Sequence, residues 1–166
     1  LFLGSAEQRK SLGLADIETA RHHAGERIVF VESKKDGVLF RAVEDTLELD
    51  SFVILRPNLS GEDLREALTR AMSHVGKLYD FSFDFSSADR LACTELVYRS
   101  FHTAGDTEFC LDEIAGRKCL SAEELMNQAL SEDWFDVFAA YGIGADDWKE
   151  GGAARDALRA SYAAKF

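Results

Sequence analysis

Proline and long apolar runs are scarce in this sequence of 166 residues. Its one proline is Pro57, and its longest apolar runs, such as Phe52–Leu55, fall far short of the roughly 20 residues that span a bilayer. We therefore expect no membrane-spanning helix. No low-complexity tract and no internal repeat divides the chain. With 46% hydrophobic residues, a chain of this length buries one substantial core, and we predict a single domain over residues 1–166.

Cysteine is equally scarce, with only Cys93, Cys110 and Cys119. A small, odd number of cysteines does not build a disulfide framework. Cys110 and Cys119 lack the C-x-x-C spacing of a zinc site and have no neighbouring histidine, so we expect no metal and no cofactor. Both are predicted to be core or surface thiols, and a single disulfide between them stays open. The compartment also stays open, with the cytoplasm favoured.

Clusters of lysine and arginine are missing as well. Acidic residues outnumber basic ones by 30 to 19, and the formal net charge is −11. Nucleic acids and anionic membrane surfaces attract clustered cationic side chains. The composition therefore argues against both as partners and indicates a solvated acidic surface, while it leaves the oligomeric state open.

Alternating and helical patterns are both present, and together they predict an α+β fold. Strands are predicted at Leu1–Leu3, Arg27–Glu32, Val38–Arg41, Phe52–Arg56 and Phe135–Tyr141. Helices are predicted at Gly61–Val75, from Cys93 onward, at Ala122–Leu130 and at Ala153–Ala163. Asp36-Gly37 is a hairpin turn signal, Ser60 is a good helix N-cap, and Ala6–His23 has the composition of a polar surface insertion. We expect one antiparallel sheet with helices on one side.

Cys93 lies in the first turn of a predicted helix. Free backbone N–H groups and the helix dipole favour negative charge there, and so favour the thiolate form. The same amides can donate hydrogen bonds to the oxyanion that forms when a thiolate attacks a carbonyl group. Cys93 shares a helix face with Leu96 and Phe101, so we expect its thiol on the inward side. The alternative is a buried, inert cysteine, since cysteine is among the most buried residue types.

Glu32 is a carboxylate at the end of an apolar strand. Alternation along Arg27–Glu32 places it on the same face as Ile28 and Phe30. A carboxylate in a buried row costs free energy unless it is paired, and one use for it there is to orient a catalytic imidazole. The alternative is that the strand ends at Val31 and Glu32 faces water in the following loop.

None of the four histidines fits the general base of a cysteine–histidine pair. His74 lies off the apolar stripe of its predicted helix, and His102 lies on the opposite side of a helix from Cys93. His22 and His23 fall in the polar insertion. We interpret all four as surface residues.

Two segments carry a resemblance to a known family. Gly76–Phe81, G-K-L-Y-D-F, is similar to a G-K-P-Y-D-F segment, with Leu78 in place of the usual proline. Cys93–Tyr98, C-T-E-L-V-Y, matches a helix start written C-[S/T]-E-L-V-[Y/W]. Val31-Glu32 and Leu55–Pro57 add weaker matches. These motifs lie within residues 1–101 and are those of the permuted papain-like amidases of the YiiX/YaeF type, in the NlpC superfamily of cysteine hydrolases, which this chain resembles.

The resemblance implies a circularly permuted, papain-like fold in which an antiparallel sheet packs against helices. In that family the histidine comes first, in a strand written roughly H-[VAS]-[GA]-[LI]-[YF]-[LIV]-G, and Leu1–Gly4 is similar to the end of that strand. We therefore expect the catalytic histidine just upstream of Leu1. The resemblance further implies Cys93 as the nucleophile, Glu32 as the acid that orients the imidazole, and Tyr79 beside the oxyanion.

The function implied by this resemblance is hydrolysis of an amide or ester bond through a thioester on Cys93. The expected substrate is a small molecule, a peptide or a lipid, with cell-wall peptides and acyl-lipids as candidates. An acyltransferase of the same fold and a catalytically silent binding module are the alternatives. Tyr79 has the alternative role of a core aromatic residue. We expect both Glu95 and Asp80 to be structural, Glu95 as a charge at a helix start and Asp80 in a turn or as a salt-bridge partner.

Overall fold

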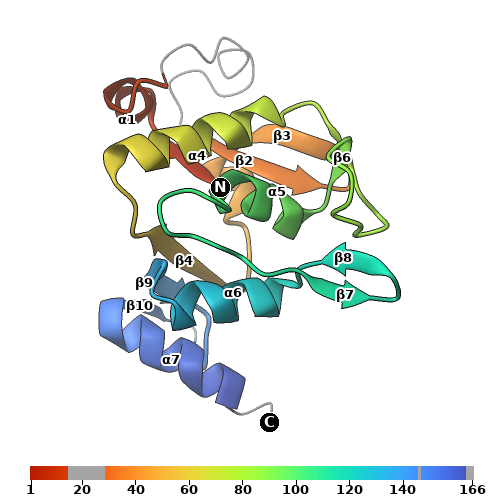
Figure 1. Cartoon of the computed structure of the whole chain (residues 1–166). Helices are drawn as coiled ribbons and strands as arrows, with labels where there is room; N and C mark the ends of the chain where they lie inside the picture. Colours follow the sequence, from red (N-terminus) through yellow and green to blue (C-terminus); the bar gives the residue numbers. More distant parts are fainter. Residues whose placement is uncertain (15–28, 146, 164–166) are drawn as a thin grey trace.

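The computed structural model describes residues 1–14, 29–145 and 147–163 and confirms the α+β class (Figure 1). In chain order the elements are β1 (Phe2–Gly4), α1 (Ala6–Ser11), β2 (Val29–Lys34), β3 (Gly37–Ala42), α3 (Val43–Thr46), β4 (Phe52–Pro57), α4 (Gly61–Ser73), β5 (Leu78–Tyr79), β6 (Arg90–Leu91), α5 (Cys93–Phe101), β7 (Asp112–Ile114), β8 (Arg117–Cys119), α6 (Ala122–Ser131), β9 (Phe135–Tyr141), β10 (Trp148–Glu150) and α7 (Gly151–Ala163). The predicted insertion Ala6–His23 is described as far as Leu14, and its residues 15–23 lie outside the described residues.

Strand pairing divides the structure into two main sheets, so the single sheet that we expected is wrong. One antiparallel sheet has the order β1-β2-β3, and the other has the order β10-β9-β4. A parallel pair, β5–β6, and a hairpin, β7–β8, complete the described strands. β4 pairs with the distant strand β9 and not with the β2–β3 hairpin that precedes it, a choice that alternation within one strand does not specify.

The β2–β3 hairpin confirms the turn signal with a shift of one residue. Lys34 pairs with Gly37, so the turn residues are Lys35 and Asp36, while Gly37 opens β3 with a positive φ of 106°. A Cβ atom on Gly37 would lie 2.5 Å from the Lys77 carbonyl oxygen, which only glycine avoids. This close approach couples the hairpin to the segment that enters β5, since Val38 donates a backbone hydrogen bond to that same oxygen at 2.9 Å.

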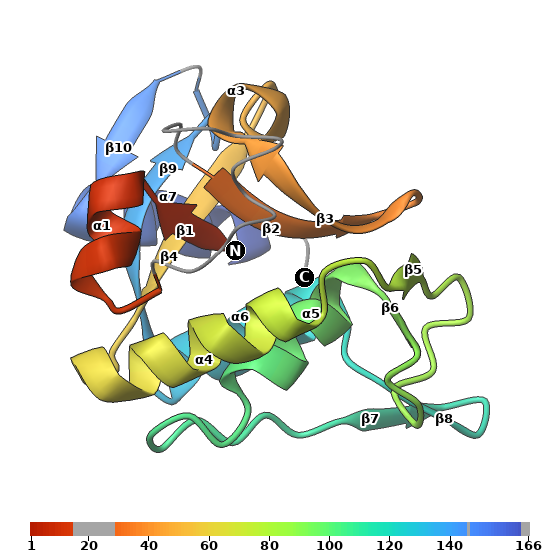
Figure 2. The same ribbon diagram turned by 90° about the horizontal axis from the view of Figure 1, so that it is seen from above.

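Helix α4 begins at its predicted cap. The Ser60 hydroxyl accepts a hydrogen bond from the Asp63 amide at 3.1 Å, which satisfies one free N–H of the first turn. Leu68 on α4, Leu96 on α5 and Val31 on β2 belong to one buried cluster between the two helices and the first sheet. Figure 2 shows α4 and α5 side by side next to this sheet.

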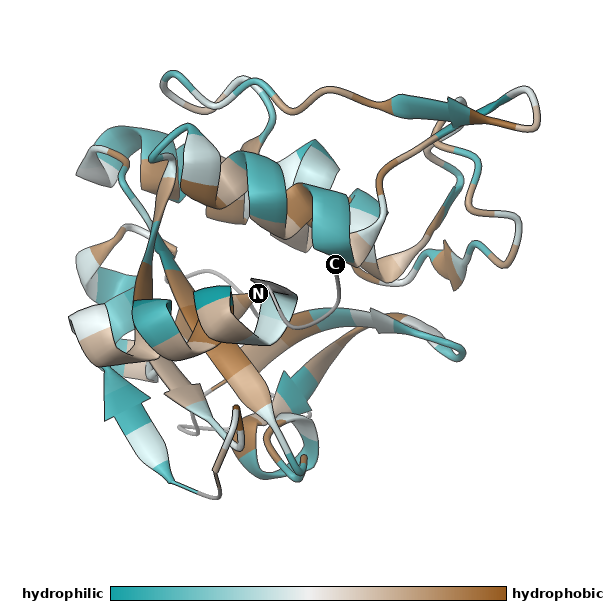
Figure 3. Ribbon diagram, turned by 90° about the horizontal axis from the view of Figure 1, so that it is seen from below, coloured by the Kyte–Doolittle hydropathy of each residue, from teal (hydrophilic) through white to brown (hydrophobic). Residues whose placement is uncertain are grey.

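Two further clusters join the remaining layers. Phe101 and Phe109 pack their rings against Phe135 of β9, at centroid distances of 5.3 and 6.4 Å. Further along the same strand, Val137 packs with Leu158 of α7. Hydrophilic residues cover the outer sides of the helices, and apolar residues face inward (Figure 3). No helix in the described part of the chain is long and apolar enough to cross a bilayer.

Candidate functional site

Cys93 is the first residue of α5, as expected, but its side chain is exposed and not inward. The buried face of α5 is formed one turn later, by residues that include Leu96, Ser100 and Phe101. The burial of Cys93 that the alternative assumed is therefore wrong.

The start of α5 presents unpaired backbone donors next to this thiol. The Leu96 amide makes the first hydrogen bond back along the helix, to the Ala92 carbonyl at 3.0 Å. The amides of Cys93, Thr94 and Glu95 therefore have no carbonyl partner within the helix. Such amides, with the helix dipole behind them, stabilise an anion placed at the helix end.

Tyr79 lies next to Cys93, at the end of β5. Its phenol pKa is raised, first by partial burial and then by the neighbouring Cys93 side chain. A phenol held in its protonated form is a hydrogen-bond donor at neutral pH. β5 pairs with β6 through Tyr79 and Leu91, and only Ala92 separates β6 from Cys93, which explains why the two side chains meet.

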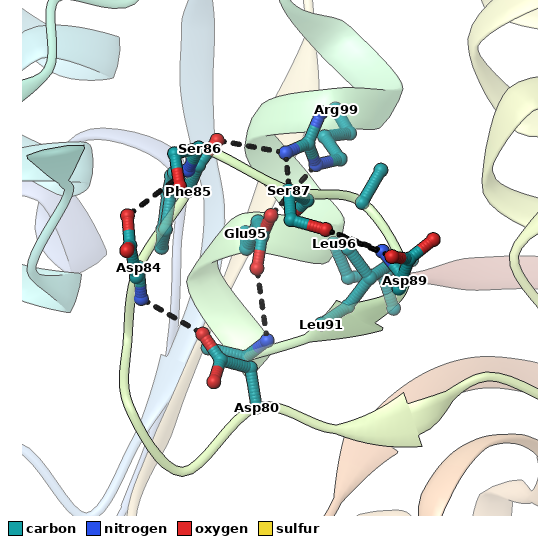
Figure 4. A network of polar contacts seen from close by, with 12 residues as sticks. Asp80, Asp84, Phe85, Ser86, Ser87, Asp89, Leu91, Glu95, Leu96 and Arg99 are labelled. Atoms are coloured by element: carbon teal, nitrogen blue, oxygen red, sulfur yellow. Dashed lines mark hydrogen bonds and ion pairs between the residues drawn. The ribbon is translucent and has the colours of Figure 1, made fainter.

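A buried ion pair anchors the start of α5 (Figure 4). Glu95 has no exposed surface, and its carboxylate accepts from Arg99 Nε at 2.7 Å and from the Ala92 amide at 3.3 Å. Burial raises the pKa of Glu95, and Arg99 opposes that rise. Arg99 Nη2 also donates to the carbonyl oxygens of Phe85 and Ser87, at 2.8 and 2.9 Å. The pair therefore ties the chain before β6 to the helix that carries Cys93.

Asp80 shapes the turn that follows β5, as we expected from its motif. Its two carboxylate oxygens accept from the Ser82 amide at 2.8 Å, the Ser82 hydroxyl at 2.6 Å and the Asp84 amide at 2.8 Å. Burial alone would raise the pKa of Asp80, but these hydrogen bonds outweigh it and the pKa is lowered. The carboxylate is therefore ionised at neutral pH and holds the turn in one conformation.

Glu32 lies within β2, which continues to Lys34, so the alternative in which the strand ends at Val31 is wrong. The side chain is 25% exposed. Its carboxylate forms ion pairs with Lys34 at 2.9 Å and Arg41 at 3.3 Å, and Thr46 donates a long hydrogen bond at 3.5 Å. All of these partners belong to β2, β3 and α3.

The face of β2 that packs against the helices is the opposite one. Val29, Val31 and Ser33 are buried, whereas Phe30 and Glu32 point away from that side. The Ser33 hydroxyl donates to the Leu91 carbonyl at 2.6 Å, close to the start of α5. Our expectation that Glu32 belongs to the buried row is therefore corrected. Among the described residues, no contact joins Glu32 to Cys93.

The two described histidines are half-buried, which corrects their assignment as surface residues. Burial, followed by the charges of Lys77 and Arg99, lowers the pKa of His74 to about 4, so its ring is neutral at pH 7. The His102 ring stacks on Tyr98 with a centroid distance of 4.7 Å. Neither histidine contacts Cys93 in the described contacts. His22 and His23 lie outside the described residues.

The other cysteines and the cavities are separate from this site. Cys110 and Cys119 are free, and the described residues form no cluster suited to a metal ion. A polar cavity of about 390 Å³ opens elsewhere, beside the first turn of α4. Its lining includes Asp63, Asp106 and Trp134, and none of the candidate catalytic residues.

Fold and site together define a mixed α+β protein with an exposed cysteine at a helix start and a tyrosine hydroxyl beside it. No protein family, curated protein or solved structure matches the chain. What the chain does therefore has to be argued from the site itself.

Two features of the site were missed in the sequence. Phe81 and Phe83 surround Tyr79, and Arg99 holds the carboxylate of Glu95. The i, i+4 spacing of Glu95 and Arg99 was a usable signal for the ion pair. The exposure of the two phenylalanines had no such signal, because an aromatic run is typical of a buried strand as much as of an exposed loop.

Proposed function

We propose that this chain is the core of a cysteine hydrolase with a permuted papain-like arrangement, which cleaves an amide or ester bond through a thioester on Cys93. One observation carries the proposal. An exposed thiol occupies the first position of α5, where free amides and the Tyr79 hydroxyl supply hydrogen-bond donors. A nucleophile and its oxyanion donors are thereby within one small region.

The proposed reaction has two acyl-transfer steps. The Cys93 thiolate attacks the carbonyl carbon, and the oxyanion accepts hydrogen bonds from the Cys93 amide and the Tyr79 hydroxyl. The carbon–nitrogen or carbon–oxygen bond then breaks as the leaving group takes a proton from the protonated base. Water gives a proton to the same base and attacks the thioester, which releases the acid and returns Cys93. An amine or alcohol in place of water would make the same site an acyltransferase.

The base in this proposal is the histidine that the family resemblance places before Leu1. Leu1 pairs with Val31 through backbone hydrogen bonds of 2.7 and 2.8 Å, so a continuation of β1 would run beside Glu32 and Ser33. The family spacing places the histidine third before Leu1, opposite Lys34 and on the face of Glu32, which is the face of the sheet turned away from α5. Glu32 would then lie beside that ring, but a regular continuation of β1 does not bring the ring to Cys93, so the resemblance and not this geometry supports the histidine as the base.

Selective alkylation of Cys93 tests whether this thiol is activated. The folded protein, with the residues that precede Leu1, is treated with iodoacetamide near neutral pH, and each cysteine is followed by peptide mass spectrometry. We expect Cys93 to react fastest, since a thiolate and not a thiol attacks the reagent. Cys110 is the matched control, because it is also exposed but does not begin a helix. Equal rates at both cysteines would contradict the proposal.

A further inference from the structure

Exposed apolar side chains gather on the segment that follows β5. Leu78, Phe81 and Phe83 are 55%, 70% and 44% exposed, and we call residues 78–83 the aromatic loop. Apolar side chains of this size usually lose their contact with water on folding, because burial stabilises the folded state. Two of them, Phe81 and Phe83, pack on the Tyr79 ring, and exposed apolar groups gathered in this way mark a binding surface.

This surface is continuous with the candidate nucleophile. The Tyr79 ring makes edge-to-face contacts with Phe81 and Phe83, at centroid distances of 4.9 and 6.1 Å. The same tyrosine pairs with Leu91, two residues before Cys93, and the Cys93 side chain raises its phenol pKa. An apolar group that rests on the two phenylalanines is therefore one ring away from the sulfur.

The loop is held in the conformation that exposes these rings. Asp80 fixes the turn through its hydrogen bonds to Ser82 and Asp84. Phe83 has a φ of 52°, in the left-handed region that a bulky residue adopts at a cost in free energy. Arg117 adds a hydrogen bond from the β7–β8 hairpin to the Ser82 carbonyl at 3.1 Å. Figures 1 and 2 show this hairpin at the same end of the molecule as β5 and β6.

The carboxylates in and next to the loop accept hydrogen bonds from nearby amides, which favours an apolar ligand. The Asp80 carboxylate accepts from within the loop, and the Asp84 carboxylate accepts from the Ser86 amide at 3.1 Å. A peptide ligand needs free donors and acceptors for its backbone. A hydrocarbon chain needs none and requires only apolar contact.

We propose that the aromatic loop binds the hydrocarbon chain of a long-chain acyl substrate, so that Cys93 acts on fatty-acyl esters or amides. This inference rests on the proposed function, because it names the acyl group that is transferred to the cysteine. The chain lies on Phe81 and Phe83, and Tyr79 places the acyl carbonyl at the sulfur.

Hydrolysis of p-nitrophenyl acetate, octanoate and dodecanoate by the protein with its upstream residues tests the inference. We expect kcat/KM to rise by about tenfold or more from acetate to octanoate, since each methylene in apolar contact adds binding. In the double variant Phe81→Ser/Phe83→Ser, the ratio of kcat/KM for octanoate to kcat/KM for acetate should fall close to one. Leu49→Ser is the matched control, because Leu49 is 55% exposed but lies between α3 and β4. It should keep the wild-type ratio.

A binding measurement separates failure of this inference from failure of the proposed function. Dodecylphosphocholine is titrated below its micellar concentration, and aromatic NMR signals of Phe81 and Phe83 are followed; we expect saturable shifts. Hydrolysis through Cys93 without chain-length preference or saturable shifts would overturn the inference and leave the hydrolase standing. Saturable binding without hydrolysis of any ester would overturn the function and leave only an apolar-ligand site. If an aromatic peptidyl ester were cleaved faster than the dodecanoate ester, the loop would bind a peptide and not an acyl chain, and this would overturn the inference.

Discussion

Replacement of Cys93 by serine is expected to lower kcat/KM for a cleavable ester by about 10³-fold or more in the protein with its upstream residues. A serine hydroxyl is not ionised at neutral pH, so the helix start no longer has an anion to stabilise. Steady-state hydrolysis of the ester substrate measures the loss, and circular dichroism checks that the variant is folded.

Cys110→Ser provides the control for the loss of a thiol as such. Cys110 is exposed in the segment before β7 and has no contact with Tyr79 among the described residues. This variant should hydrolyse the ester as the wild type does. If Cys93→Ser retained full activity while Cys110→Ser lost it, the nucleophile would have been assigned to the wrong cysteine.

Replacement of Arg99 by methionine is expected to destabilise the fold by about 3–5 kcal/mol at neutral pH. The change leaves the fully buried Glu95 carboxylate without its ion pair and the Phe85 and Ser87 carbonyl groups without a donor. The free energy of unfolding from urea titration measures the loss. The loss should shrink as the pH falls, because protonation removes the unpaired charge. A raised pKa of Glu95 in the folded state means that stability is gained below that pKa and lost above it.

Arg155→Met is the matched control for this experiment. Arg155 also lies on a helix and faces a carboxylate, but its 3.4 Å contact with Asp133 is exposed. Removal of that pair should change stability by less than about 1 kcal/mol. A loss at Arg99 that is no larger than the loss at Arg155 would show that the buried pair does not anchor α5.

Local signals in the sequence predicted several elements, including the helix that carries Cys93. Ser60 capped α4 as its side chain and position indicated, and β9 has the bounds that its alternation predicted. Cys93 opens α5 as expected. These features depend on neighbours along the chain, which the sequence contains directly.

Features that depend on distant segments were not predictable in the same way. β4 pairs with β9, and this divides the strands between two sheets. Glu32 faces away from the helices because Ser33 and Val31 reach them, and a period of two gives no sign of which face is covered. Phe83 has a left-handed φ and an exposed ring, although an apolar side chain of this size is usually buried.

Capture of the covalent intermediate tests the central claim most directly. The protein with its upstream residues is mixed with p-nitrophenyl octanoate, stopped with acid within the first turnover, and digested for peptide mass spectrometry. We predict an octanoyl thioester on Cys93 that hydroxylamine removes and that Cys93→Ser does not form. Ester cleavage with the acyl group on another residue, or with no acyl group on Cys93 at any time, would contradict the account.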